Sequence, residues 1–159
     1  MSKLISRAGL LGLSSLLASL SASLLSANAL ADGLNEEKPF AEAHVILQVS
    51  DADPRRHRTV LDIANNLTRH YGGPDMADIE IIAFSTGVTM LLARDNRDAQ
   101  RIADLMENGV RFYVCGNTLD TIERRDGTRP VVLPGVSEVQ TGVAFMIEEI
   151  GKGYVPIHP

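Results

Sequence analysis

Short apolar runs alternate with helical patterns from His44 to the end of the chain. The apolar runs predict β-strands, because they are rich in Val, Ile and aromatic side chains and are bounded by turn residues. They cover His44–Val49, Ile79–Phe84, Val110–Val114, Val136–Val139 and Tyr154–Ile157. The first run is apolar on both faces through its middle, which is typical of a strand that helices cover on both sides.

The segments between these runs have the spacing of amphipathic helices. Their apolar positions are Val60, Ala64, Leu67 and Tyr71 in the first long helix, Ala99, Ile102, Ala103 and Met106 in the second, and Val143, Met146, Ile147 and Ile150 in the last. We expect the last helix to begin at Thr141, to bury its stripe and to end at Gly151. A shorter helix is expected around Thr118–Arg124. Such alternation predicts an α/β protein with a mostly parallel sheet and helices on both faces.

Composition narrows the class of protein. The chain has 159 residues, of which 45% are hydrophobic, enough for one globular domain. A net charge of −5 argues against a nucleic-acid binder, which needs clustered Lys and Arg to displace counterions from phosphates. A single cysteine excludes a disulfide framework within the chain and a cysteine-rich zinc site. The four histidines are scattered and no nucleotide-binding glycine motif is present, so we expect neither a metal nor a cofactor.

The first 31 residues look like a targeting signal. Lys3 and Arg7 give a positive start, and residues 8–31 carry no charge. This stretch is rich in Leu, Ala and Ser and closes with Ala-Leu-Ala, the small-x-small pattern that a signal peptidase cleaves. We expect cleavage after Ala31 and a periplasmic or secreted product. The alternative is a retained membrane anchor, since an uncharged stretch of this length can span a bilayer.

Cleavage would remove two basic residues and no acidic ones. The product, residues 32–159, would carry 13 basic and 20 acidic side chains and a net charge of −7. Residues 32–43 read as a flexible polar lead-in, and residues 44–159 as the folded domain. After cleavage we expect no association with a membrane.

Three segments follow the predicted strands directly. In a parallel α/β sheet the ligand crevice lies at the carboxyl ends of the strands, so these segments should meet at one edge. The residues that we expect to shape a pocket there are Ser50, Asp51, Ser85, Thr86, Gly87, Gly116 and Asn117. The only cysteine of the sequence, Cys115, falls on the same edge.

The position of Cys115 suggests a chemical role. A cysteine just before a helix faces the unpaired N–H groups and the positive dipole end of that helix, which stabilise the reactive thiolate. Gly116 leaves room for a second molecule to approach the sulfur, and Asn117 could cap the helix or hold a ligand. The alternative is that Cys115 is a small, unreactive core residue.

The cysteine segment also resembles a known family. The run Asn108–Leu119 is similar to the cysteine segment of the small branch of DsrE/DsrF-like proteins, and Cys115 matches the cysteine of that branch. Other segments resemble later or neighbouring motifs of the family, namely Phe84–Val88 with Leu91-Leu92, Leu133–Val136, Gly142-Val143 and Gly153–Ile157. The resemblance extends over roughly His44 to Pro159.

This resemblance implies a three-layer α/β/α sandwich around a five-stranded, flavodoxin-like sheet, and assembly into trimers or hexamers. In the sulfur-relay members it also implies a cysteine that carries a persulfide between a donor and an acceptor protein. The chain departs from those members in its export signal and in having no second cysteine to resolve a persulfide.

We therefore interpret the chain as an exported DsrE-like protein, possessing a sulfur-binding or sulfur-transferring Cys115. The alternatives are a noncatalytic module that binds a small molecule or anion, and an oligomeric scaffold with an incidental thiol. A homo-oligomer is expected, and the apolar run Val131–Leu133 is the spare surface that subunits could bury. The sequence names neither a sulfur donor nor an acceptor.

Overall fold

The structure is a computed structural model that describes residues 35–159. These residues form one compact unit, Asn35–Pro159. The targeting signal expected in residues 1–31, with its cleavage after Ala31, lies outside the described residues. Within residues 35–159, no helix is long and apolar enough to cross a membrane.

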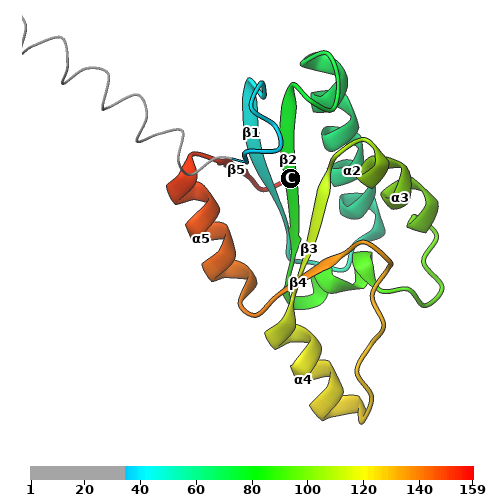
Figure 1. The fold of residues 1–159 in the computed structure, drawn as a ribbon. Helices are drawn as coiled ribbons and strands as arrows, with labels where there is room; N and C mark the ends of the chain where they lie inside the picture. Colours follow the sequence, from blue (N-terminus) through cyan, green and yellow to red (C-terminus); the bar gives the residue numbers. More distant parts are fainter. Residues whose placement is uncertain (1–34) are drawn as a thin grey trace, which may run out of the picture. The chain divides into compact units, whose positions relative to one another are not determined.

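All five expected strands are present, and they form one parallel sheet in the order β4-β3-β2-β1-β5. Their bounds are Ala43–Val49 for β1, Ala77–Ala83 for β2, Arg111–Cys115 for β3, Ser137–Val139 for β4 and Val155–Ile157 for β5. The chain moves outward from β1 to β4 and then returns to place β5 beside β1 (Figure 1). The fold is therefore α/β and flavodoxin-like, as expected.

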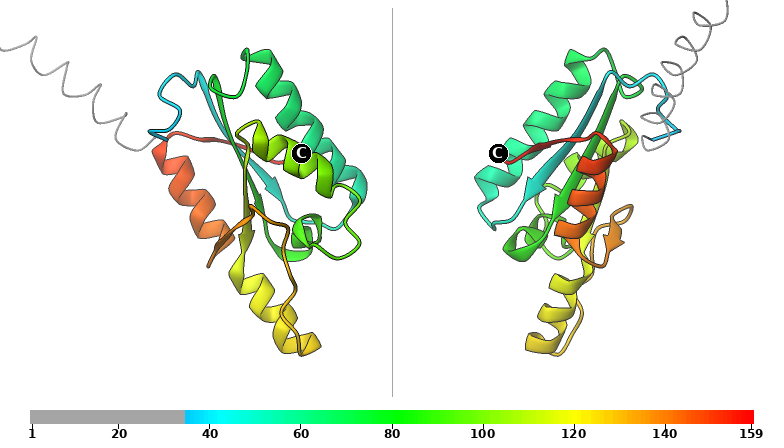
Figure 2. Two further views of the ribbon diagram at one scale, coloured as in Figure 1. Left: turned by 45° about the vertical axis from the view of Figure 1, so that its right-hand side comes forward. Right: turned by 90° about the vertical axis from the view of Figure 1, so that its left-hand side faces the viewer.

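One face of the sheet carries the hydrophobic core. It is covered by α2 (Pro54–His70), α3 (Ala99–Glu107) and the short 3-10 helix η1 (Ser85–Leu91), which lie together on one side of the strands (Figures 1 and 2). Alternate residues of the three central strands point into this core, because successive side chains of a strand face opposite sides. The core residues of these strands are Val45, Leu47, Val49, Ile79, Ile81, Ala83, Phe112 and Val114.

The opposite face is covered by α5 (Gly142–Lys152), and here the sequence prediction is wrong. Of its expected buried stripe, Val143 is 44%, Ile147 63% and Ile150 39% exposed. Within this helix only Gly142 and Glu149 are fully buried. Apolar spacing identifies a helix and an apolar side, but it cannot say whether that side meets the chain's own sheet. The helix also ends two residues later than expected, because Gly153, at φ 114°, supplies the left-handed stop.

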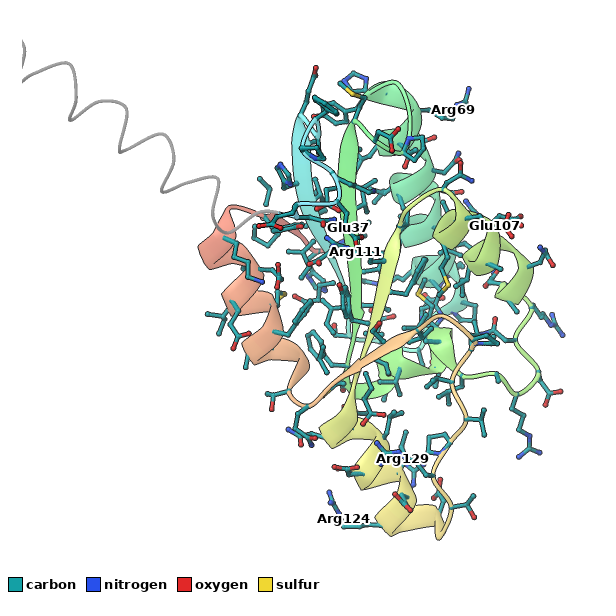
Figure 3. The ribbon with its side chains drawn as sticks, in the orientation of Figure 1. Glu37, Arg69, Glu107, Arg111, Arg124 and Arg129 are labelled. Atoms are coloured by element: carbon teal, nitrogen blue, oxygen red, sulfur yellow. The ribbon has the colours of Figure 1, made fainter. Side chains whose placement is uncertain are left out.

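A cluster of charged side chains is buried beneath α5, on the face of the sheet that also carries the buried Ile46 and Ile82. Asp78 and Glu80 on β2 are buried and both pair with Arg111 of β3, at 2.9 and 3.0 Å. Tyr154, just after α5, also bonds Asp78. In Figure 3, Arg111 lies over the middle of the sheet.

The polar lead-in is tied to the sheet by one side chain. The Lys38 ammonium donates to the carbonyl oxygens of Ala77 at 3.0 Å and Gly109 at 2.7 Å, at the amino end of the strands. Lys38 therefore fixes the described part of the lead-in to the domain.

Helix α4 (Gly116–Asp126) projects beyond the carboxyl edge of the sheet (Figures 1 and 2). It is longer than the expected Thr118–Arg124 because it begins directly where β3 ends. The segment after it returns to pair Val132 with Leu92 in an antiparallel bridge. Of the expected spare apolar run, Leu133 is buried and Val131 is 74% exposed.

Candidate functional site

Three loops meet at the carboxyl edge of the sheet, as the topology predicts. The Thr86 hydroxyl donates to the Ser50 carbonyl oxygen at 3.3 Å, which joins the loops after β1 and β2. The Ser85 amide donates to Thr118 Oγ1 at 3.2 Å, which joins the loop after β2 to the start of α4. Side chains far apart in the sequence are thereby brought to one edge.

Gly87 is the point of closest approach between two of these loops. A Cβ atom placed on Gly87 would lie 2.3 Å from the Val49 carbonyl oxygen, far inside van der Waals contact. Only glycine allows η1 to pass so near the end of β1. Gly87 is buried, and it contributes to the carboxyl edge of the sheet by letting two loops lie close together.

A cavity of about 540 Å³ opens between η1 and α4. Its polar lining consists of hydroxyls and two nitrogen-bearing side chains, supplied by Ser85, Thr86, Thr89, Asn117, Thr118, Thr121 and Arg125. Ala52, Val88 and Ile122 give it an apolar part. This combination suits a small polar or anionic molecule with an apolar portion.

Cys115 lies at the junction of β3 and α4, where it is the N-cap residue of the helix. Its side chain is on the α5 side of the sheet, because a Cβ on Gly142 would lie 3.1 Å from Cys115 Cβ. The residue is 6% exposed and is not among those lining the cavity. Thr118, one turn along α4, does line that cavity.

The thiol faces the beginnings of two helices. The first is α4, which the sequence predicts. The second is α5, whose Gly142 amide donates to Cys115 Sγ at 3.3 Å, while the thiol lies 3.8 Å from the Gln140 carbonyl oxygen. Partial positive charge from both helix ends therefore converges on one sulfur atom.

These surroundings set the acidity of the thiol. Burial by itself raises the pKa of Cys115, since it disfavours the charged thiolate. The hydrogen bond from Gly142, with a contribution from nearby Thr118 and Asn117 at the start of α4, stabilises the thiolate and outweighs burial, so the pKa lies below that of an ordinary cysteine. A lowered pKa makes the nucleophilic form available nearer to neutral pH.

A set of polar contacts joins α4 to the chain between β4 and α5. Asn117 donates from its main-chain nitrogen to the Gln140 carbonyl oxygen at 3.0 Å, and its side chain bonds both Gln140 and Thr141. Arg129 reinforces this junction by bonding Asp120 on α4 and Glu138 on β4. Figure 3 shows Arg129 beside α4.

The expected pocket residues divide into two groups. Ser85, Thr86 and Asn117 line the cavity. The other four do not line it. The Ser50 carbonyl oxygen accepts the Thr86 hydrogen bond, and Asp51 accepts a hydrogen bond from the Asp53 amide and pairs with Arg56 at the start of α2. Gly87 permits the close approach of η1 to β1, and Gly116 is packed against Glu138.

Several residues of the site were not foreseen: Thr89, Thr121 and Arg125 line the cavity, and three more lie beside the thiol. Thr118, Gln140 and Gly142 all lie near Cys115, but only Thr118 is close to it in sequence. Thr118 could have been found as the third residue of the helix, a position that faces a cap. No local pattern places Gln140 and Gly142 beside Cys115, since they are about 25 residues away; Gly142 was noted only in a segment that resembles the family. Within residues 35–159, no group of His, Cys, Asp and Glu side chains is arranged to hold a metal ion.

Fold and site together describe a flavodoxin-like α/β protein whose single cysteine is the N-cap residue of the helix after its third strand. Comparison with protein families gives this class a name. The model of the DsrE/DsrF-like family matches residues 43–145, and the chain belongs to that family. Membership supports a function of the sulfur-relay type at the level of the family.

The solved structures similar to this chain include the following two. MTH1491 of Methanobacterium thermoautotrophicum, described as a protein of unknown function, is 28% identical; the match has a TM-score of 0.64 and covers 74% of this chain and 100% of that one. The YchN protein of E. coli is 19% identical, with a TM-score of 0.55 and coverage of 73% and 99%, and it supports the fold alone. Among curated proteins, none matches this chain.

Proposed function

We propose that this protein carries sulfur as a persulfide on Cys115. The observation that carries the proposal is the placement of the thiol, at the start of α4 and hydrogen-bonded by the Gly142 amide, in a member of the DsrE/DsrF-like family. That placement lowers the thiol pKa and so favours the thiolate, which is both the nucleophile and the form that accepts a sulfur atom.

The transfer needs no external oxidant or reductant. The Cys115 thiolate attacks the outer sulfur of a persulfide or polysulfide donor, and a new S–S bond forms on Cys115. The S–S bond of the donor breaks, and the donor leaves as a thiolate or a shorter polysulfide. An acceptor thiolate later attacks the outer sulfur in the same way, and Cys115 departs as a thiolate.

Cyanolysis tests this proposal. Purified protein is incubated with inorganic polysulfide, freed of excess reagent and treated with cyanide, which removes sulfane sulfur as thiocyanate. We expect close to one thiocyanate per chain from the wild type and none from Cys115→Ser. Equal amounts from both proteins would assign the sulfur elsewhere and overturn the proposal.

A second function is favoured by one observation, namely that Cys115 does not line the cavity between η1 and α4. In this second function, the cavity binds a small anion through Arg125 and the hydroxyl side chains that line the cavity, and the thiol is incidental. A fragment screen read by crystal density would show occupancy of the cavity in both the wild type and Cys115→Ser. Occupancy together with a negative cyanolysis result would favour this function.

We also propose that the protein works outside the cytoplasmic membrane. The support is the charge-free stretch that ends in Ala-Leu-Ala at Ala31. Intact mass of the native protein tests this, since the mature chain should begin at Asp32. A full-length species that needs detergent would contradict it.

Self-association is the last part of the proposed function. The apolar stripe of α5, formed by Val143, Ile147 and Ile150, is exposed in the single chain. Burying such a stripe against a second copy would remove apolar area from water without disturbing the site. A homo-oligomer, a trimer or a hexamer, is consistent with this surface.

A further inference from the structure

Asn117 makes three hydrogen bonds to two consecutive residues. Its main-chain nitrogen donates to the Gln140 carbonyl oxygen at 3.0 Å. Its side-chain oxygen accepts from Gln140 Nε2 at 2.7 Å, and its side-chain nitrogen donates to Thr141 Oγ1 at 3.0 Å. Both polar atoms of the Asn117 side chain are therefore directed at the Gln140-Thr141 pair.

The same pair leads directly to the residue that contacts the thiol. Gly142 follows Thr141, and its amide donates to Cys115 Sγ at 3.3 Å. The Gln140 carbonyl oxygen lies 3.8 Å from that sulfur. Asn117 thus holds one side of a turn whose other side contacts Cys115.

Neighbouring contacts hold the ends of this turn: Arg129 bonds Glu138, and Val139 pairs with Cys115 in the sheet. The strand before it, β4, has three residues and lies at the edge of the sheet. The helix after it, α5, buries only Gly142 and Glu149 fully. Gln140 and Thr141 themselves are joined to α4 by the hydrogen bonds of Asn117, so the position of the Gly142 amide depends on these bonds as well.

We propose that Asn117 is a positioning residue for Cys115: its side chain holds the Gln140-Thr141 turn, and thereby keeps the Gly142 amide directed at the sulfur. This role rests on the proposed use of Cys115 as a sulfur acceptor. It differs from the expectation that Asn117 binds a ligand, because the polar atoms of the side chain are already engaged within the protein. Asn117 acts through Gly142 and touches no substrate.

The test measures the rate of Cys115 alkylation by iodoacetamide as a function of pH. The variants are Asn117→Ala, Gln140→Ala and the double substitution, none of which changes a charge. Loss of one N–H donor to the thiolate should move the midpoint of the pH profile upward by about 0.5–1 pH unit. Both single variants weaken the same turn, so the double variant should shift the midpoint little further than either one.

Asn66→Ala is the matched control, because Asn66 is an exposed helical asparagine on α2. Its profile should coincide with that of the wild type. An unchanged midpoint in folded Asn117→Ala, or fully additive shifts in the double variant, would overturn the proposal. If Asn117→Ala fails to fold, Gln140→Ala tests the same turn from its other side.

Alkylation requires no sulfur donor, so the two proposals can fail separately. A thiol that takes up no sulfur but shows these shifts would refute the persulfide proposal and support the positioning role. If the wild type and Asn117→Ala take up sulfur equally well and have the same midpoint, the persulfide proposal is supported and the positioning role of Asn117 is refuted.

Discussion

At the scale of single residues, Cys115 shows how two opposing effects decide the reactivity of a thiol. Burial disfavours the thiolate, whereas the donors at the starts of α4 and α5 favour it. The balance is a pKa below the ordinary value, which gives the thiolate at lower pH than an exposed cysteine would. Reactivity in this site therefore depends on backbone geometry more than on any charged neighbour.

Two glycines, Gly87 at the site and Gly151 near the end of α5, should respond to alanine in opposite ways. Gly87→Ala would place Cβ 2.3 Å from a backbone oxygen, so we expect a loss of about 2 kcal/mol or more in the free energy of unfolding. Gly151→Ala places Cβ in open space on α5, so stability should be unchanged or rise by up to about 0.5 kcal/mol. Urea unfolding of both variants measures the difference.

The two glycine variants serve as controls for each other, because the substitution is the same. Equal stability of Gly87→Ala and the wild type would show that η1 can move away from β1. That result would contradict the close approach at this edge of the sheet.

At the scale of elements, the sequence predicts which segments are strands and which are helices, and the structure agrees within about two residues at most ends. Periodicity carries this information because it reports a side-chain pattern local to each segment. The face of α5 is different: Val143 and Ile147 repeat at helical spacing whether they meet the sheet or another subunit.

Contacts between segments that are far apart in the chain also could not be predicted from the sequence. Glu80 lies in the run Ile79–Phe84, which reads as an ordinary strand, and Asp78 lies just before that run. Nothing local indicates that both carboxyls are buried against Arg111. Likewise, the Gly142 amide reaches Cys115 only after β4 pairs with β3. The edge of the sheet was predictable because topology alone places loop ends there.

The cluster beneath α5 should make stability depend on pH through Glu80. Burial raises the pKa of Glu80 to about 7; Arg111 opposes this shift, and Glu149 and Asp78 add to it. The folded state therefore binds a proton that the unfolded chain releases near pH 4.5. This contribution to stability is complete below about pH 4.5 and is lost as the pH rises through 7.

Glu80→Gln tests this dependence, since glutamine keeps the shape and cannot ionise. Between pH 5 and 8 the wild type should lose up to about 2–3 kcal/mol in the free energy of unfolding relative to the variant. The measurement is urea unfolding across that pH range. Parallel curves for the two proteins would show that Glu80 is ionised throughout.

At the scale of the whole molecule, the sheet has one well-covered face and one face with a single helix. The exposed stripe on α5 is the surface that we expect a second copy to cover. Ile147→Glu should leave the chain folded, because Ile147 is 63% exposed. It should shift the cleaved chain, residues 32–159, toward a monomer of about 14 kDa at micromolar concentration.

Light scattering of wild type and Ile147→Glu decides this point. Arg124→Glu is a suitable control, because Arg124 is an exposed residue near the distal end of α4 (Figure 3). A wild type that is already monomeric, or an Ile147→Glu protein that remains oligomeric, would show that the α5 stripe is not a subunit interface.

The central claim is that Cys115 in the folded protein accepts a sulfur atom. Native mass spectrometry of the chain after treatment with inorganic polysulfide tests it most directly. We predict an increase of about 32 Da, one sulfur atom, that a thiol reductant removes and that Cys115→Ser does not show. A folded wild type that gains no mass, while its denatured form is readily modified, would contradict the claim and make Cys115 a residue of the core.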